Sequence, residues 1–178
     1  MRGRLSRLVA RYLAPKLYAA SLADVSPQAL LDAGIRGVIL DLDNTLVPWS
    51  SDRLSAVERE WVARCLASGL RLCIVSNTRR PSRLKALSQE LGIPCVRAGK
   101  PRRRGFRQAM LLLDASPATT AVIGDQLLTD ILGGNRLGLY TILVRRLSHR
   151  EFIGTRLSRL AEHAIFSYLQ RHGHRPWE

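Results

Sequence analysis

Short apolar runs alternate with amphipathic segments through the middle of this chain. The apolar runs are bounded by turn-forming residues and are too short for buried helices, so they predict strands of a parallel sheet buried on both faces. These predicted strands are 37–42, 70–75, 94–96, 120–123 and 140–144. The segments between them carry apolar residues at helical spacing. They predict helices at 53–68, 81–91, 102–113 and a segment that ends near 132, where Gly133-Gly134 is expected to turn the chain into the last strand.

This alternation of strands and helices predicts an α/β fold with a doubly wound, mostly parallel sheet. A chain of 178 residues fits one such domain, 1–178. Basic extensions at 1–20 and 145–178 are expected to flank its core. The first contains an amphipathic helix that Pro15 ends, and the second contains a helix at about 153–169. The apolar side of the N-terminal helix consists of Leu5, Leu8, Val9, Tyr12 and Leu13.

The charge balance is strongly basic. The chain has 28 Lys and Arg residues against 14 Asp and Glu residues, a net charge of +14, which predicts attraction to polyanions or to an anionic membrane surface. No run reaches the roughly 18 apolar residues that span a bilayer. The N-terminus lacks a secretory signal, although its Arg-rich start is also compatible with an organelle transit peptide. The three cysteines lie isolated in apolar segments and are expected to be reduced. We therefore expect a cytoplasmic protein that can bind peripherally to the inner face of the membrane, and we predict no particular oligomeric state.

Two aspartates, Asp41 and Asp43, lie where the first predicted strand ends. The two-residue period of a strand places them on one face, and the carboxyl ends of strands are where ligands bind in open α/β sheets. Two like charges this close require a cation between them or a shared proton. The alternative is an Asp-Asn turn in which Asn44 and Thr45 cap the next segment.

Other predicted strands also end in polar residues. Ser76-Asn77 follows the second strand, Lys100 follows the third, and Asp125 follows the fourth, with Asp130 shortly after it. Each alone also fits a turn, a solvated lysine or a helix N-cap. Their succession, each after a strand, favours a single site at one edge of the sheet. Lys100 is one of only three lysines in this Arg-rich chain, which favours a position that needs a compact ammonium group.

Phosphoryl transfer is the chemistry that fits these residue types. Asp41 is the expected nucleophile, which attacks phosphorus and forms an aspartyl-phosphate. Asp43 is expected to protonate the leaving oxygen and then to activate water. Because the nucleophile and the phosphate are both negative, a hard divalent cation such as Mg²⁺ is needed, and Asp125 is expected to complete its site. Ser76 and Lys100 are expected to bind the phosphate oxygens.

These motifs resemble those of the haloacid dehalogenase (HAD) phosphatase superfamily, and more closely its YqeG-type, subclass IIIA group. The resemblance rests on 41–49 (DLDNTLVPW), Ser76-Asn77, Lys100-Pro101 and 124–140 (GDQLLTDILGGNRLGLY). It implies a Rossmann-like fold and Mg²⁺ dependence. The metal ligands that we expect are Asp41, Asp43, Asp125 and Asp130. The substrate-binding residues that we expect are Thr45, Ser76, Asn77 and Lys100. The sequence departs from the expected pattern at Thr78-Arg79-Arg80, which is expected to alter substrate contacts.

The intervals between these motifs leave no room for a cap module. The family inserts such modules after the first motif or between the second and third, but here each interval is filled by one predicted helix and one strand. A capless site suggests a substrate that is large or fixed to a surface.

An arginine cluster directly after Lys100 could contact a second phosphate, and the alternative is a solvated helix face. The cluster consists of Arg102, Arg103, Arg104 and Arg107.

The leading functional hypothesis is therefore a Mg²⁺-dependent phosphatase at a membrane surface, acting on phosphatidylglycerophosphate. This substrate is suggested by the similarity to capless HAD phosphatases that act on that lipid. One alternative is a soluble phosphatase for a nucleotide, a sugar phosphate or a nucleic-acid end. Another is a basic RNA- or ribosome-binding protein with a vestigial site. Aromatic residues make up 6% of the chain and are not interleaved with the basic clusters, which disfavours nucleic acid as the partner.

Overall fold

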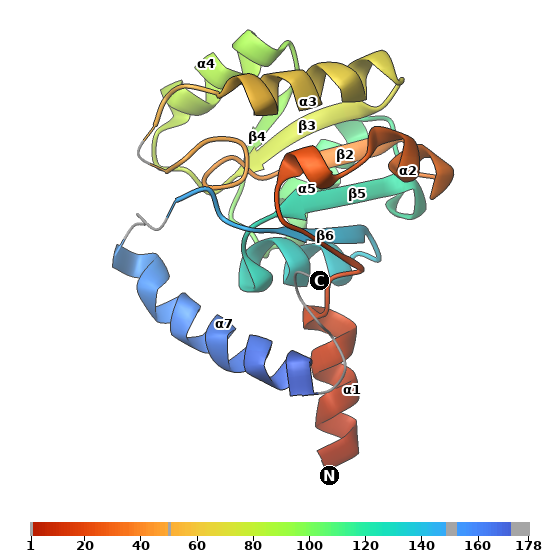
Figure 1. The fold of residues 1–178 in the computed structure, drawn as a ribbon, viewed down its shortest axis with the longest axis vertical. Coiled ribbons are helices and arrows are strands. Elements are labelled where there is room, and N and C mark those ends of the chain that lie inside the picture. The colour runs from red at the N-terminus through yellow and green to blue at the C-terminus, as the bar shows by residue number, and fades with distance from the viewer. Residues whose placement is uncertain (1, 50, 149–152, 172–178) are drawn as a thin grey trace.

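A six-stranded parallel sheet lies at the centre of the computed structural model, which describes residues 2–49, 51–148 and 153–171 (Figure 1). Its strands are β1 Leu17–Ala19, β2 Gly37–Leu40, β3 Arg71–Ser76, β4 Cys95–Arg97, β5 Thr120–Gly124 and β6 Tyr140–Val144. The strand order is β1-β6-β5-β2-β3-β4, and every pair is parallel. The chain therefore winds outward from the central strand β2 in both directions, as a doubly wound sheet does.

Helices cover both faces of this sheet. The α-helices are α1 Arg2–Leu13, α2 Pro27–Asp32, α3 Ala56–Ala67, α4 Pro81–Leu91, α5 Arg103–Leu112, α6 Leu132–Asn135 and α7 Ile153–Arg171. Three shorter turns complete the fold: the 3₁₀ turns η1 Leu22–Asp24 and η2 Pro117–Thr119, and the π-helical turn η3 Leu127–Ile131.

The alternation of side chains along β2 explains why both faces are covered. Val38 and Leu40 are buried in the core that α3 and α4 cover, whereas Ile39 is buried on the opposite side with α5. On the first side, the fully buried Trp61 of α3 donates a hydrogen bond of 2.7 Å from Nε1 to the carbonyl of Val25. Its ring fills the core while its polar atom is satisfied, as a buried tryptophan requires.

The predicted doubly wound, mostly parallel sheet is confirmed. All five predicted strands form, although β2 ends at Leu40 rather than at 42. A sixth strand, β1, was not predicted: it lies within the stretch 1–20 that we expected to be an extension. It pairs with β6, and the amide of Lys16 donates to the carbonyl of Thr141 at 2.9 Å just before this strand. A three-residue strand is too short to show a period in the sequence, so its partner strand is what reveals it.

The pair Gly133-Gly134 lies inside helix α6, so the predicted turn at this position is wrong. A Cβ atom at Gly133 would lie 2.4 Å from Cε2 of Phe106, and one at Gly134 would lie 2.5 Å from Cγ1 of Val122. The two glycines therefore let α6 approach α5 and β5 more closely than any side chain would allow. The chain turns later, at Gly138, where φ is +76°.

Helices α1 and α7 form the two basic ends of the chain, and α7 contacts both α1 and η3 (Figure 1). The side chains of Ile165 and Phe166 in α7 pack against the buried Leu127 and Ile131 of η3. The last turn of α1 is tied to α6, because Nδ2 of Asn135 donates to the carbonyls of two residues at 3.0 Å each. The acceptors are Tyr12 and Ala14. No helix among the described residues is long and apolar enough to cross a membrane.

Candidate active site

The carboxyl ends of four strands place polar side chains at one edge of the sheet. Asp41 follows β2 and Asp125 follows β5, and the two strands are neighbours, since the amide of Asp41 donates to the carbonyl of Ile123 at 2.9 Å. Ser76 ends β3, and Lys100 follows β4. Winding reverses beside β2, which makes this edge the switch point at which ligands bind in such sheets.

Three carboxylates meet at this edge and form what we call the acidic group, Asp41, Asp125 and Asp130. One oxygen of each lies within 4.8 Å of the others, and all three residues are buried. The ammonium of Lys100 lies among them, with Nζ 2.5 Å from Oδ1 of Asp41 and 2.7 Å from Oδ1 of Asp130. Lys100 is only 7% exposed, so the alternative of a solvated loop lysine is wrong.

Burial dominates the electrostatics of this group. It raises the pKa of Asp41 to about 7, an effect that the Lys100 ammonium opposes and the Asp130 carboxylate reinforces. Burial by itself would lower the pKa of Lys100, but Asp130 and Asp41 outweigh it and raise that pKa above its ordinary value. Lys100 therefore stays protonated at neutral pH and supplies a permanent positive charge next to the predicted nucleophile.

The position of Asp130 depends on the lack of a side chain at Gly124. A Cβ atom at Gly124 would lie 2.3 Å from Cγ of Asp130. With glycine there, the turn η3 folds back over the end of β5, and Oδ2 of Asp130 accepts a hydrogen bond of 3.2 Å from the amide of Gln126. The local sequence Gly124-Asp125-Gln126 thus brings two carboxylates five positions apart into one site.

The acidic group fits a hard divalent cation. Oδ2 of Asp41 is buried and has no hydrogen-bond partner among the described residues, which is costly unless a ligand satisfies it. The Lys100 ammonium contacts two of the three carboxylates, those of Asp41 and Asp130. Carboxylate oxygens are the donors that Mg²⁺ prefers. The structure thus brings together three of the four predicted metal ligands.

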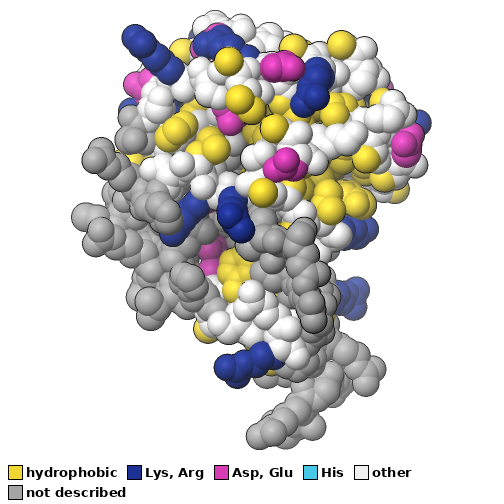
Figure 2. Space-filling model, viewed as in Figure 1, with side chains coloured by type: hydrophobic (Ala, Val, Ile, Leu, Met, Phe, Trp, Pro, Cys, Tyr) yellow, Lys and Arg dark blue, Asp and Glu magenta, His cyan; other side chains and the backbone are white. Residues whose placement is uncertain are grey.

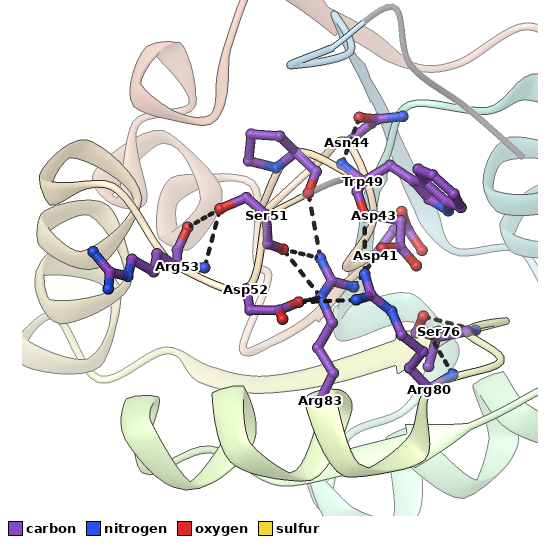
Figure 3. Close-up of polar contacts among 12 residues, drawn as sticks. Asp41, Asp43, Asn44, Trp49, Ser51, Asp52, Arg53, Ser76, Arg80 and Arg83 are labelled. Atoms are coloured by element: carbon purple, nitrogen blue, oxygen red, sulfur yellow. Dashed lines mark hydrogen bonds and ion pairs between the residues drawn. The ribbon is translucent and has the colours of Figure 1, made fainter.

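Asp43, the fourth predicted ligand, has a different partner. Its Oδ1 accepts a 2.6 Å hydrogen bond from Nη1 of Arg83 in α4, so its carboxylate is engaged outside the acidic group (Figure 3). Because β2 ends before Asp41, the strand period does not extend to Asp43 as predicted. Arg83 was not predicted as a site residue, since nothing in the sequence distinguishes it from the many other arginines.

The predicted substrate-binding residues have several environments. Ser76 is fully buried, and its Oγ accepts a hydrogen bond from the amide of Thr78 at 3.1 Å. Asn77 brackets the backbone of Lys100, accepting from its amide at 2.7 Å and donating to its carbonyl at 3.0 Å. Asn77 therefore positions Lys100 in the structure. The Oγ1 atom of Thr45 is buried without a partner among the described residues, so it remains available to a ligand.

The segment that departs from the expected family pattern has a structural partner. Arg80 donates to the carbonyl of Trp49 at 3.1 Å and pairs with Asp52 at 3.2 Å (Figure 3). It thereby fastens the loop after Asp43, which we call the Trp49 loop and which comprises the described residues 48–49 and 51–52.

Four arginines near Lys100 are exposed: Arg102, Arg103, Arg104 and Arg107.

Asn44 connects two segments near the site, the Trp49 loop and the segment after β6. Its φ is +64°, a conformation that asparagine tolerates better than most residues. Its Oδ1 accepts from the amide of Trp49 at 3.1 Å, and its carbonyl accepts from the amide of Leu147 at 2.9 Å. The side chains of Trp49 and Leu147 are each 38% exposed. The segment after β6 thus reaches the loop that follows the predicted nucleophile.

Comparison with known proteins agrees with this geometry. The HAD-hydrolase-like family model matches residues 97–166. The chain is also 38% identical over 174 residues to the protein named Probable phosphatase YqeG of Bacillus subtilis (strain 168), covering 96% of this chain and 99% of that protein. The chain belongs to the HAD-like phosphatases. HAD phosphatases generally use a divalent metal, which agrees with the buried acidic group.

Two further similarities concern more distant HAD-like proteins. Phosphatidylglycerophosphate phosphatase 1, chloroplastic/mitochondrial, of Arabidopsis thaliana is 29% identical over 177 residues, which cover 93% of this chain and 51% of that protein. The cobalt-bound deoxy-D-mannose-octulosonate 8-phosphate phosphatase of Haemophilus influenzae has the same fold, with a TM-score of 0.52 at 16% identity. That alignment covers 63% of this chain and 69% of the other. The predicted family and enzyme class are thus confirmed.

Proposed function

We propose that this HAD-like chain is a Mg²⁺-dependent phosphomonoester phosphatase that works through an aspartyl-phosphate on Asp41. The observation that carries the proposal is the pairing of Asp41 with Lys100 inside the buried acidic group. The Asp41 carboxylate has one oxygen held by an ammonium and one buried oxygen that has no partner among the described residues. The second oxygen is the one that we expect to attack phosphorus.

The reaction divides into two displacements. In the first, an Asp41 oxygen forms a bond to phosphorus, the bond to the leaving oxygen breaks, and Asp43 donates a proton to that oxygen. In the second, Asp43 takes a proton from water, the water oxygen attacks phosphorus, and phosphate leaves while Asp41 regains its carboxylate. Lys100 offsets negative charge in both steps. Mg²⁺ held by Asp41, Asp125 and Asp130 would reduce the repulsion between the carboxylate and the phosphate.

For the substrate, we propose phosphatidylglycerophosphate at the surface of an anionic membrane, reached from the cytoplasmic side. Two groups of observations support it. First, the Arabidopsis relative carries this lipid in its name. Second, the described chain has no cap module next to the site: between Asp43 and Ser76 it forms only α3 and β3, and between Ser76 and Lys100 only α4 and β4. A headgroup projecting from a bilayer can therefore reach the site without displacing a cap.

The surface also suits an anionic membrane. Lys and Arg side chains are spread over the described part of the face in Figure 2, and the net charge of the chain is +14, which favours attraction to an anionic surface. The four exposed arginines near Lys100 are available to a second phosphate. Trp49 and Leu147 present partly exposed apolar side chains beside the site, and tryptophan is favoured at membrane interfaces.

Phosphate release from phosphatidylglycerophosphate in mixed micelles and from a soluble phosphomonoester tests the proposal. With Mg²⁺, the wild-type protein should hydrolyse both, and Asp41→Asn should lose activity by on the order of 10²-fold or more. Asp32→Asn, which removes an exposed carboxylate on α2, is the matched control and should retain activity. Activity of Asp41→Asn close to that of the wild type would contradict the nucleophile assignment. Hydrolysis of the soluble ester alone would contradict the lipid substrate and favour the soluble alternative.

A further inference from the structure

Arg83 is a buried arginine whose partners connect α4 to the predicted acid/base. Its side chain is 5% exposed and points from α4 toward Asp43 and the Trp49 loop (Figure 3). Nη1 donates to Oδ1 of Asp43 at 2.6 Å. The other guanidinium nitrogens serve the Trp49 loop: Nη2 donates to the carbonyls of Ser51 at 2.7 Å and Pro48 at 3.3 Å, and Nε lies 2.9 Å from Oδ1 of Asp52.

We propose that Arg83 is a positioning residue that holds the Asp43 carboxylate ready for proton transfer and apart from the acidic group. The inference rests on the acid/base role given to Asp43 under the proposed function. Without Arg83, no other side-chain contact of Asp43 among the described residues would keep its carboxylate from turning toward a cation held by the acidic group. Held by Arg83, the Asp43 side chain lies outside the acidic group, where it can face the leaving oxygen instead of the cation.

Different nitrogens of Arg83 contact Asp43 and the Trp49 loop, and this makes the positioning role possible. When Asp43 turns toward the leaving oxygen, the bond from Nη1 is lost, but the contacts of Nη2 and Nε remain. Asp52 still balances the charge of the guanidinium. A buried arginine without any acidic partner would be costly, and Asp52 avoids that cost. Only the planar fork of arginine reaches a carboxylate and two carbonyls at once, so lysine cannot replace it fully.

Arg80 provides a matched control for this proposal. It fastens the same Trp49 loop, through the carbonyl of Trp49 and the carboxylate of Asp52, and its side chain is about half exposed. These contacts are to the Trp49 loop and not to Asp43. If Arg83 only held the loop in place, loss of Arg83 and loss of Arg80 would affect catalysis in the same manner.

The dependence of rate on the leaving group separates the two roles. An alkoxide leaving group needs a proton from Asp43, whereas p-nitrophenolate departs without one. The experiment compares kcat/KM, which reports the first displacement, for an alkyl phosphate and for p-nitrophenyl phosphate with Mg²⁺. The variants are Arg83→Met, Arg83→Lys, Arg80→Met and Asp43→Asn, and thermal unfolding checks that each one folds.

We expect Asp43→Asn and Arg83→Met to lose at least about tenfold more activity on the alkyl ester than on the aryl ester. Arg80→Met should affect both esters equally. Arg83→Lys keeps a charge and serves as the test if Arg83→Met does not fold; we expect it to show a smaller loss of the same kind. Equal losses on both esters for the Arg83 variants, with a selective loss for Asp43→Asn, would overturn the inference about Arg83. The acid role of Asp43 would then still hold. A selective loss for Arg80→Met would also overturn it, since the loop would then be the cause. If Asp43→Asn shows no selective loss, the acid role of Asp43 and the inference both fail.

Discussion

At the scale of single residues, the buried ion pairs of this site determine its chemistry more than the exposed charges do. The ammonium of Lys100 lies between Asp41 and Asp130 and is almost fully buried. A buried charge keeps its state only while its partners remain, because removal of one partner leaves the other uncompensated in a low dielectric. Lys100 should therefore matter for stability as well as for catalysis.

Lys100→Met should lower kcat/KM by on the order of 10²-fold, because a preorganised positive charge is lost. In the absence of metal, it should also lower the free energy of unfolding by roughly 3–5 kcal/mol, since two buried carboxylates then face each other. Added Mg²⁺ should recover part of that stability. Urea denaturation with and without Mg²⁺ measures this. Lys85→Met, an exposed lysine on α4, is the control, and an unchanged rate for Lys100→Met would contradict the role given to Lys100.

At the scale of elements, glycine positions determine how closely β5, η3, α5 and α6 pack around the site. Gly124 allows η3 to fold back so that Asp130 joins the acidic group, and Gly133 allows α6 to lie against the ring of Phe106. In both places a side chain lies against the glycine so closely that an added methyl group would collide with it. The path of the chain between β5 and β6 therefore depends on small residues rather than on turn formation.

Gly133→Ala should destabilise the fold by about 1–3 kcal/mol, the usual range for overpacking a core. The added methyl would lie 2.4 Å from the Phe106 ring, so either the ring or α6 must move. Urea denaturation measures the loss. Gly99→Ala is the comparison, because a Cβ there would have its nearest neighbour, the side chain of Arg102, at 3.8 Å; its effect should stay within about 0.5 kcal/mol. Equal stability of the two variants would show that α6 can shift without cost.

At the scale of the whole molecule, the two basic ends come together on one side of the sheet. Helix α7 contacts α1, and Asn135 anchors the last turn of α1 to the domain. Leu8 of α1 is nevertheless 49% exposed. Thus the end of α1 packs on the domain, while part of its apolar side stays exposed and available to a membrane surface.

The protein should sediment with anionic vesicles at low salt and be released at high salt, since each basic residue near such a surface contributes about 1 kcal/mol. Replacing Arg2, Arg4 and Arg7 with glutamine should weaken this binding strongly. Replacing three exposed arginines elsewhere changes the net charge equally and should weaken it less: Arg36, Arg53 and Arg64. Equal losses would mean that net charge alone attracts the protein, and that the N-terminal helix has no special role.

The strands β2 to β6, the helices α3, α4 and α5 between them, and the polar residues that follow the strands could be predicted from the sequence alone. Strands repeat their side-chain direction every two residues and helices every 3.6 residues. These patterns, and the turn-forming residues between them, can be recognised from positions that are close in the sequence. Asp41, Lys100, Asp125 and Asp130 could therefore be predicted as one site, because parallel strands deliver their carboxyl ends to one edge. The helix α4, Pro81–Leu91, matches its predicted range for the same reason.

Which residues from distant segments become partners depends on how the elements pack in three dimensions. The strand β1 exists because β6 pairs with it, and Arg83 is a site residue because α4 places it 2.6 Å from a carboxylate 40 positions earlier in the chain. Likewise, Gly133 and Gly134 look like a turn until Phe106 and Val122 are found against them. Contacts of this kind depend on how layers pack in space, and no local pattern of residues encodes them.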